Sequence, residues 1–132
     1  MKLSIKFVVL LLLLSGFFVV AAGAGEKKPA LPKLMDLGAH KCVACKKMTP
    51  VLDELAQEYQ GVFAVEFVDV WQKENRDTAV KYKVRMIPTQ IFFNVEGEEL
   101  WRHVGFLSKM DILRKWRQLG YDFKVPAAGH KQ

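Results

Sequence analysis

Hydrophobic residues along this chain follow two spacings that alternate from one segment to the next. Over residues 45–59 they recur every three or four positions, which is the period of a helix with one buried face. The members of this stripe are Cys45, Met48, Leu52, Leu55 and Tyr59. Pro50 falls inside the stripe, where a proline removes one backbone hydrogen bond, so the pattern predicts a kinked helix that ends at Gly61.

Shorter apolar runs predict strands. Residues 33–37 form one such run. Residues 62–70 are nearly continuous β-branched and aromatic residues around Glu66, which is typical of a strand buried on both faces. Residues 91–93 and 100–104 flank a short turn that contains a glycine, and this arrangement predicts an antiparallel hairpin.

Two further helices complete the pattern. The polar stretch over residues 72–83 predicts a short helix that crosses the sheet. Ser108, with Asp111 three residues later, resembles a capping box and predicts the start of a last helix that Gly120 ends. Other residues with the spacing of core positions are Phe92, Phe93, Phe106 and Trp116. The predicted order is β-α-β-α-β-β-α, an α/β fold.

The first 24 residues have the layout of a secretory signal. Lys2 and Lys6 precede an apolar run over residues 7–20, and small residues follow over 21–24. This order of basic, apolar and small residues favours export with cleavage after Ala24. The alternative is an uncleaved anchor, because the run together with the small residues reaches the short end of a membrane-spanning length.

The chain is therefore divided into four parts. Residues 1–24 are the signal peptide or anchor, 25–33 a flexible lead, 34–120 the folded domain and 121–132 a C-terminal tail. The formal charge is +6, and it is +4 without the two lysines of the signal. Basic residues are interspersed with acids, so we expect no nucleic acid as partner. We expect a monomer.

The candidate chemistry lies in the two cysteines, Cys42 and Cys45, at the predicted start of the first helix. Such thiols can form and open a disulfide, and the unpaired N–H groups of a helix start favour the attacking thiolate. Two alternatives use the same pair. A copper carrier or other metal-binding module would take both sulfurs as ligands, although His40, His103 and His130 lack the spacing of a closed zinc site. A structural disulfide would close only a four-residue loop, which adds little stability.

Three segments resemble the thioredoxin family. Residues 42–56 are similar to its active-site helix, 81–89 to its cis-proline loop and 104–109 to the entry of its last helix. The resemblance implies a thioredoxin fold trimmed at the N-terminus. Its central mixed sheet would have four strands, or five if residues 29–32 add an edge, flanked by helices.

The chain departs from thioredoxin around the cysteines. Thioredoxin has a tryptophan directly before the first cysteine, where this chain has Lys41. Val43 and Ala44, between the cysteines, resemble instead the C-terminal domain of the membrane reductase DsbD.

The expected mechanism combines these residues with the resemblance. Cys42, at the helix start, is the expected nucleophile, and Cys45 would then attack Cys42 to release the product. The resemblance places a buried acid at Asp36, whose pKa burial would raise and which would move the proton of Cys45. The bond between Ile87 and Pro88 is expected to be cis, which presents the backbone of Ile87 beside the sulfurs.

Other site residues are expected to bind the substrate or to tune the thiolate. The residues expected to contact the substrate are Val43, Ala44, Met86 and Ile87. The candidate modulators are His40 and Lys41, because a positive charge beside a sulfur stabilises the thiolate. We expect no bound cofactor and no metal, since the cysteine disulfide itself carries the electrons.

These features together predict an exported thiol–disulfide oxidoreductase, periplasmic or otherwise extracytoplasmic, that residues 7–24 would tether to the membrane if the signal were not cleaved. Ile87 and Asp36 resemble the reducing members of the family, so we expect a protein-disulfide reductase supplied by a membrane electron donor of the DsbD type. The expected substrates are protein disulfides, including those of apocytochromes by family analogy. The alternative on the same fold is a disulfide-forming oxidase or isomerase.

Overall fold

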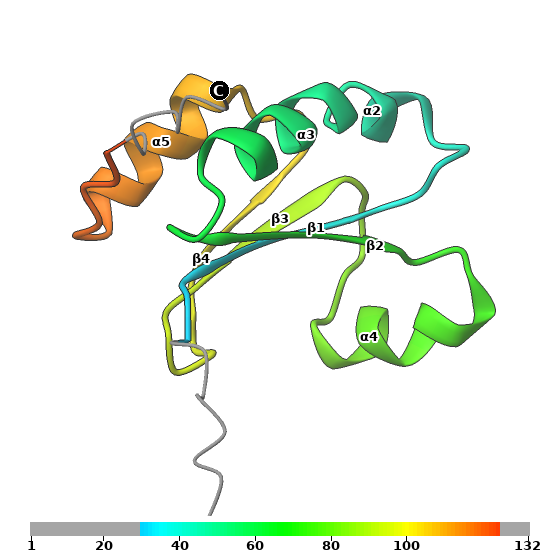
Figure 1. The fold of residues 1–132 in the computed structure, drawn as a ribbon. Helices are drawn as coiled ribbons and strands as arrows, with labels where there is room; N and C mark the ends of the chain where they lie inside the picture. Colours follow the sequence, from blue (N-terminus) through cyan, green and yellow to red (C-terminus); the bar gives the residue numbers. More distant parts are fainter. Residues whose placement is uncertain (1–29, 125–132) are drawn as a thin grey trace, which may run out of the picture.

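The computed structural model describes residues 30–124, and Figure 1 shows them as a sheet with helices on both faces. The strands are β1 (Lys33–Gly38), β2 (Ala64–Asp69), β3 (Thr89–Phe93) and β4 (Glu99–Val104). The helices are α2 (Val43–Lys46), α3 (Thr49–Glu58), α4 (Arg76–Lys81) and α5 (Lys109–Gln118), with the 3-10 helix η1 (Lys73–Asn75) before α4. The predicted order of strands and helices is confirmed.

The strand order in the sheet is β2-β1-β3-β4, with β1 and β3 in the centre. β1 runs parallel to β2 and antiparallel to β3, and β3 and β4 form the predicted hairpin. In Figure 1, α2, α3 and α5 lie on one face of the sheet and α4 lies on the other. This is the mixed four-stranded sheet that the sequence predicted, and residues 30–32 add no fifth strand.

Successive side chains of the strands point to opposite faces, so the sheet separates two apolar layers. Leu34 belongs to the larger layer, where it packs with Trp116 of α5. Met35 and Ile91 belong to the smaller layer on the opposite face. Asp36 shares a face with Leu34 and is fully buried, so an acid lies on the face of the sheet that is covered by the helix carrying the cysteines.

The second strand differs from its prediction. β2 is shorter than residues 62–70; it lies at the edge of the sheet, and most of its residues are only partly buried, so it is not a strand buried on both faces. Phe67 remains 37% exposed, and Glu66 forms an ion pair with Lys33 at 2.8 Å. A continuous apolar run cannot distinguish a central strand from an edge strand, because that depends on whether a neighbour covers its outer side.

The predicted kinked helix is two helices. α2 ends at Lys46, and α3 begins at Thr49, which places Pro50 in the first turn of α3. The N–H groups of a first turn have no partner within the helix, so a proline there removes no bond. The helix is therefore interrupted before Pro50 and is not bent at the proline.

The entry to the last helix agrees with the sequence in one respect and differs in another. Ser108 caps α5 as predicted, since its hydroxyl accepts a hydrogen bond from the N–H of Asp111 at 3.2 Å. The prediction that Phe106 belongs to the core is wrong, because its side chain is 51% exposed. Phe106 follows Gly105, whose φ of 102° turns the chain at the end of β4.

The packed part of the chain extends beyond Gly120. Tyr121 and Phe123 contact Trp116 with ring centroids 5.3 and 5.4 Å apart, so the predicted tail begins later than residue 121. The predicted signal over residues 1–24 lies outside the described residues. Within residues 30–124, none of the helices is both long and apolar enough to span a bilayer.

Candidate active site

Cys42 and Cys45 form a disulfide at the start of α2. Cys42 is the N-cap residue, and its Sγ accepts a hydrogen bond from the N–H of Cys45 at 3.2 Å. The N–H of Cys42 bonds the carbonyl of Ala39 at 3.0 Å, which fixes the turn before the helix. Cys42 is partly exposed, whereas Cys45 is 2% exposed. An incoming group can therefore reach Cys42, while Cys45 reacts from within the protein.

Asp36 lies behind the disulfide, next to Gly38 at the end of the same strand. A Cβ atom on Gly38 would lie 3.3 Å from Asp36 Oδ2 and 3.3 Å from the Cβ of Cys45. It would also lie 3.0 Å from the ring of Phe67, a tighter contact than most side chains make. The carboxyl and Cys45 therefore border the same small space, which exists because position 38 has no side chain.

The environment of Asp36 favours its protonated form. The side chain is 0% exposed, and this burial raises the pKa of Asp36 from 3.8 to about 6. A hydrogen bond of 2.6 Å from Gln90 Nε2 to Asp36 Oδ1 opposes that shift. Asp36 Oδ2 has no hydrogen-bond partner among the residues described. A carboxyl with this pKa can accept or release a proton close to neutral pH.

Pro88 directly precedes β3, at the end of the sheet where β1 leads to the cysteines. Leu37 pairs with Thr89, so the segment before β3 and the segment after β1 lie side by side. The Ile87–Pro88 bond is cis, Pro88 is buried, and the Pro88 carbonyl accepts a hydrogen bond from Gly105 at 2.8 Å. Ile87 is partly exposed.

Exposed apolar side chains lie in the loops and at the start of α2, next to the strand ends at this edge of the sheet. Val43 is 77% exposed, Met86 63%, Trp71 58% and Phe106 51%, and Ala44 is also exposed. We call Val43, Trp71, Met86 and Phe106 the apolar rim. Sequence reasoning named Val43 and Met86 for substrate contact and placed Phe106 in the core; Trp71 is added by the structure.

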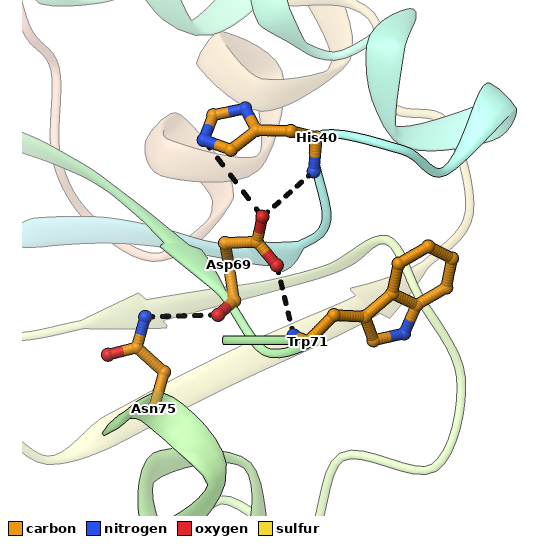
Figure 2. A network of polar contacts seen from close by, with 4 residues as sticks. All are labelled: His40, Asp69, Trp71 and Asn75. Atoms are coloured by element: carbon orange, nitrogen blue, oxygen red, sulfur yellow. Dashed lines mark hydrogen bonds and ion pairs between the residues drawn. The ribbon is translucent and has the colours of Figure 1, made fainter. Parts of the chain in front are cut away.

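Asp69, at the end of β2, is a site residue that sequence reasoning missed. Figure 2 shows its carboxylate between two loops: it accepts a hydrogen bond from the N–H of His40 at 3.1 Å and from that of Trp71 at 2.9 Å. The Asn75 side chain bonds the Asp69 carbonyl at 3.0 Å. The His40 N–H is the first cause that lowers the pKa of Asp69, and the Trp71 N–H adds to it. Asp69 thus ties the loop before Cys42 to the loop that carries Trp71.

The two candidate modulators, His40 and Lys41, lie in the loop between β1 and α2. The His40 ring lies 4.0 Å from Asp69 Oδ2 and packs on Phe67 with ring centroids 4.9 Å apart. It lines a cavity of about 150 Å³ with Phe67 and Asp53. Lys41 is exposed. The structure thus places His40 beside Asp69, and its influence on the cysteines stays a prediction.

Gln90 is the second residue that sequence reasoning missed. It is buried at 0% exposure, within a strand whose other side chains are mostly apolar. The sequence signal for Gln90 was a polar amide inside an apolar run. The signal for Asp69 was an acid at the end of such a run. Neither signal names a partner, because the partners come from other strands and loops.

Comparisons with known proteins agree with one another. The family model described as thioredoxin matches residues 26–118. Thioredoxin C-2 of Corynebacterium nephridii is 45% identical over 74 residues, which are 56% of this chain and 66% of that protein. The thioredoxin of Pseudomonas aeruginosa is 44% identical over 84 residues, covering 61% of this chain and 72% of that protein.

A solved structure supports the same fold. The exposed lipoprotein thioredoxin of Streptococcus pneumoniae superposes with a TM-score of 0.57 over 69% of this chain and 87% of that chain. The two sequences are 21% identical over the match, so the likeness concerns the fold alone.

Proposed function

Because this chain belongs to the thioredoxin family of thiol–disulfide oxidoreductases, we propose that it acts as a protein-disulfide reductase outside the cytoplasm. The observation that carries the proposal is the arrangement of three groups. Cys42 is accessible at a helix start, Cys45 is buried behind it, and Asp36 is a buried carboxyl that borders Cys45.

The reaction begins from the dithiol form. The Cys42 thiolate attacks one sulfur of a substrate disulfide, forming a mixed disulfide and releasing the other substrate sulfur as a thiolate. Cys45 then loses its proton and attacks Cys42, so the Cys42–Cys45 bond forms and the second substrate sulfur leaves. Two electrons pass to the substrate, and the protein ends as the disulfide seen in the structure.

Burial separates the roles of the two cysteines. A substrate sulfur can approach Cys42, and the N–H groups at the start of α2 stabilise the charge on its thiolate. Cys45 is too buried to meet a protein substrate, which leaves it free for the second attack. Asp36, with a pKa of about 6, suits the removal of the proton from Cys45.

Residues near the disulfide support the proposed direction of electron flow and the proposed partners. Ile87 before Pro88, and Asp36 behind the cysteines, resemble the reducing members of the family. We therefore propose that a membrane electron donor of the DsbD type reduces the Cys42–Cys45 disulfide. The substrates would be disulfides of exported proteins, including apocytochromes, and the apolar rim would contact them.

The signal-like residues 1–24 support export. Alkaline phosphatase fused after Gln132 tests this, because that enzyme needs disulfides that form outside the cytoplasm. We expect activity from the full chain and none when residues 1–24 are deleted. Equal activity of the two fusions would contradict the proposed location.

The reduction potential tests the direction. Equilibration of the protein with glutathione buffers should give a potential nearer to about −270 mV, as in thioredoxin, than to about −120 mV, as in strong oxidants. A value near −120 mV would contradict a reductase and favour the oxidase.

Substitution of each cysteine tests the division of roles. Cys42→Ser should abolish the reduction of insulin, because no accessible sulfur remains. Cys45→Ser should accumulate mixed disulfides, which can be detected by mass spectrometry as adducts on Cys42. Normal turnover of Cys45→Ser without adducts would show that the two-cysteine mechanism is wrong. Tight binding of one copper ion without insulin reduction would instead favour the metal carrier.

A further inference from the structure

Gln90 lies directly opposite Asp36 in the sheet, and neither side chain reaches solvent. Its Nε2 group donates a hydrogen bond of 2.6 Å to Asp36 Oδ1. Burial of an amide costs free energy unless the amide is bonded, so an apolar residue would be the simpler choice at this position. The hydrogen bond to Asp36 satisfies the amide, whereas packing alone would not favour an amide over an apolar side chain.

The bond places the two oxygens of the carboxyl in different surroundings. Gln90 holds Oδ1, whereas Oδ2 has no hydrogen-bond partner within the described part of the chain. Oδ2 is also the oxygen that borders the space beside Gly38, and Cys45 borders the same space. The free oxygen of Asp36 is therefore on the side of the buried cysteine.

We propose that Gln90 is a positioning residue for thiol–disulfide exchange, which holds Asp36 by Oδ1 so that Oδ2 receives the proton of Cys45. The inference rests on the proposed function, because that proton moves in the second step of the cycle. As the proton passes from the Cys45 sulfur to Oδ2, the Cys45–Cys42 bond forms and the bond from Cys42 to the substrate breaks. The substrate leaves as a thiolate with the electron pair of the broken bond.

An amide is suited to this place because it can bond both forms of the carboxyl. Its N–H groups donate to the carboxylate, and its oxygen can accept from the O–H of the protonated acid once the amide turns over. That oxygen has no partner among the residues described. A lysine would hold the carboxyl charged, and a leucine would leave it unbonded. Gln90 favours the carboxylate without preventing its protonation.

Gln90 is the side chain that hydrogen-bonds the carboxyl of Asp36. Burial raises the pKa of Asp36, and the Gln90 bond is the contact that lowers it. Phe67 faces Asp36 from β2 in the register of the sheet. Of the titratable side chains nearby, Cys45 borders the same space as Asp36, and His40 and Asp53 line a cavity together with Phe67. Lys41 lies in the loop before α2, and Asp69 bonds that loop.

Gln90→Met tests the proposal, because it removes the amide with little change in side-chain size. The Asp36 carboxyl is followed by carbon NMR in the oxidised, aspartate-labelled protein. We expect its titration midpoint to rise by about one pH unit when the bond to the charged form is lost. A midpoint that is unchanged or lower would overturn the proposal.

Ile91→Val is the matched control. Ile91 is the next residue of β3, is equally buried and points to the opposite layer, so the variant causes a mild packing loss away from Asp36. We expect no shift of the Asp36 titration. A shift as large as that of Gln90→Met would mean that any loosening of β3 moves it, and would overturn the proposal.

Kinetics separate positioning from packing. Release of substrate from the mixed disulfide should slow in Gln90→Met at both pH 6 and pH 8, and about fivefold more at pH 6, because fewer Asp36 carboxyls are ionised at the lower pH. In the Asp36→Asn background, Gln90→Met should add no further loss. Equal slowing at both pH values, or in the Asp36→Asn background, would overturn the proposal.

The two readouts distinguish this inference from the proposed function. The NMR titration uses the oxidised protein without substrate, so it does not depend on the direction of electron flow. A reduction potential of about −120 mV would contradict the proposed reductase activity without affecting the result of the Asp36 titration. A protein with the expected potential and an unshifted titration in Gln90→Met would reject this inference alone.

Discussion

Asp36 and Asp69 lie at the same end of two neighbouring parallel strands, and their side chains point to the same face of the sheet. Both are buried, at 0% and 7% exposure. Their pKa values nevertheless shift in opposite directions: that of Asp36 rises to about 6, and that of Asp69 falls below 3.8. Burial alone therefore does not decide which carboxyl is charged.

The difference comes from the supply of hydrogen-bond donors. Asp69 accepts two backbone N–H groups, from His40 and Trp71, which favour its charged form. Asp36 receives one amide N–H, from Gln90, and its second oxygen has no partner among the residues described. The first carboxyl is suited to holding two loops, and the second to exchanging a proton.

The largest expected effect is on stability. Asp36→Asn should raise the free energy of unfolding at pH 7 by about 3 kcal/mol, because a carboxyl with its pKa raised from 3.8 to about 6 is charged and buried at that pH. The native state binds the proton more tightly than the unfolded state, so the cost in the wild type disappears as the pH falls from about 6 to 4. Urea unfolding of the oxidised proteins at pH 7 and pH 4 measures it.

The pH 4 measurement is the control for this prediction. A gain of the same size at both pH values would show that the asparagine packs better, and that the charge on Asp36 costs nothing. The Asp69→Asn variant should show no such gain at pH 7, since the pKa of Asp69 is lowered.

The next effect concerns the rate. Asp36→Asn should slow the release of substrate from the mixed disulfide at neutral pH on the order of a hundredfold, the lower range for loss of a general base. The difference in release rate between Asp36→Asn and the wild type should be smaller at alkaline pH, where hydroxide can remove the proton of Cys45. Stopped-flow measurement with a fluorescent disulfide substrate gives the rate for Asp36→Asn and Asp69→Asn. Equal slowing by the two variants would remove the distinction between the two carboxyls.

Much of the fold was predictable because the local signals agree with the final packing. The stripe that contains Leu52 and Leu55 is buried, and Ser108 caps its helix as its position indicated. The strand over residues 62–70 was misjudged, because burial of its two faces depends on which distant elements pack over them. Phe106 was misjudged for a related reason, since a turn at Gly105 removes it from the core.

The site was predictable where one segment carries its chemistry. Cys42 and Cys45 are three residues apart, so a single helix start fixes their relation. Asp36 required the family resemblance, because the register of β1 sets its place. Asp69 and Gln90 were missed, since their roles arise from contacts with residues 29 and 54 positions away.

A smaller effect is expected from Asp69→Ala. Loss of the carboxylate leaves the N–H groups of His40 and Trp71 without their acceptor, so their hydrogen exchange should accelerate by roughly tenfold. The variant should be less stable than the wild type at pH 7. Because the pKa of Asp69 is lowered, its contribution is present above pH 3.8 and is lost below it, so the difference should narrow in acid. Exchange rates unchanged at both amides would show that Asp69 does not hold the loops.

The smallest effect is expected from His40→Ala, which removes the ring and keeps the backbone N–H that bonds Asp69. The side chain of His40 is 75% exposed, and its ring is 4.0 Å from the carboxylate, so the ion pair should contribute less than about 0.5 kcal/mol to the free energy of unfolding. Urea unfolding of the wild type and the variant at pH 7 measures this. A much larger loss would mean that the ring of His40, and not its backbone N–H, holds Asp69. The contrast with Asp36 would then rest on an ion pair instead of on the number of hydrogen-bond donors.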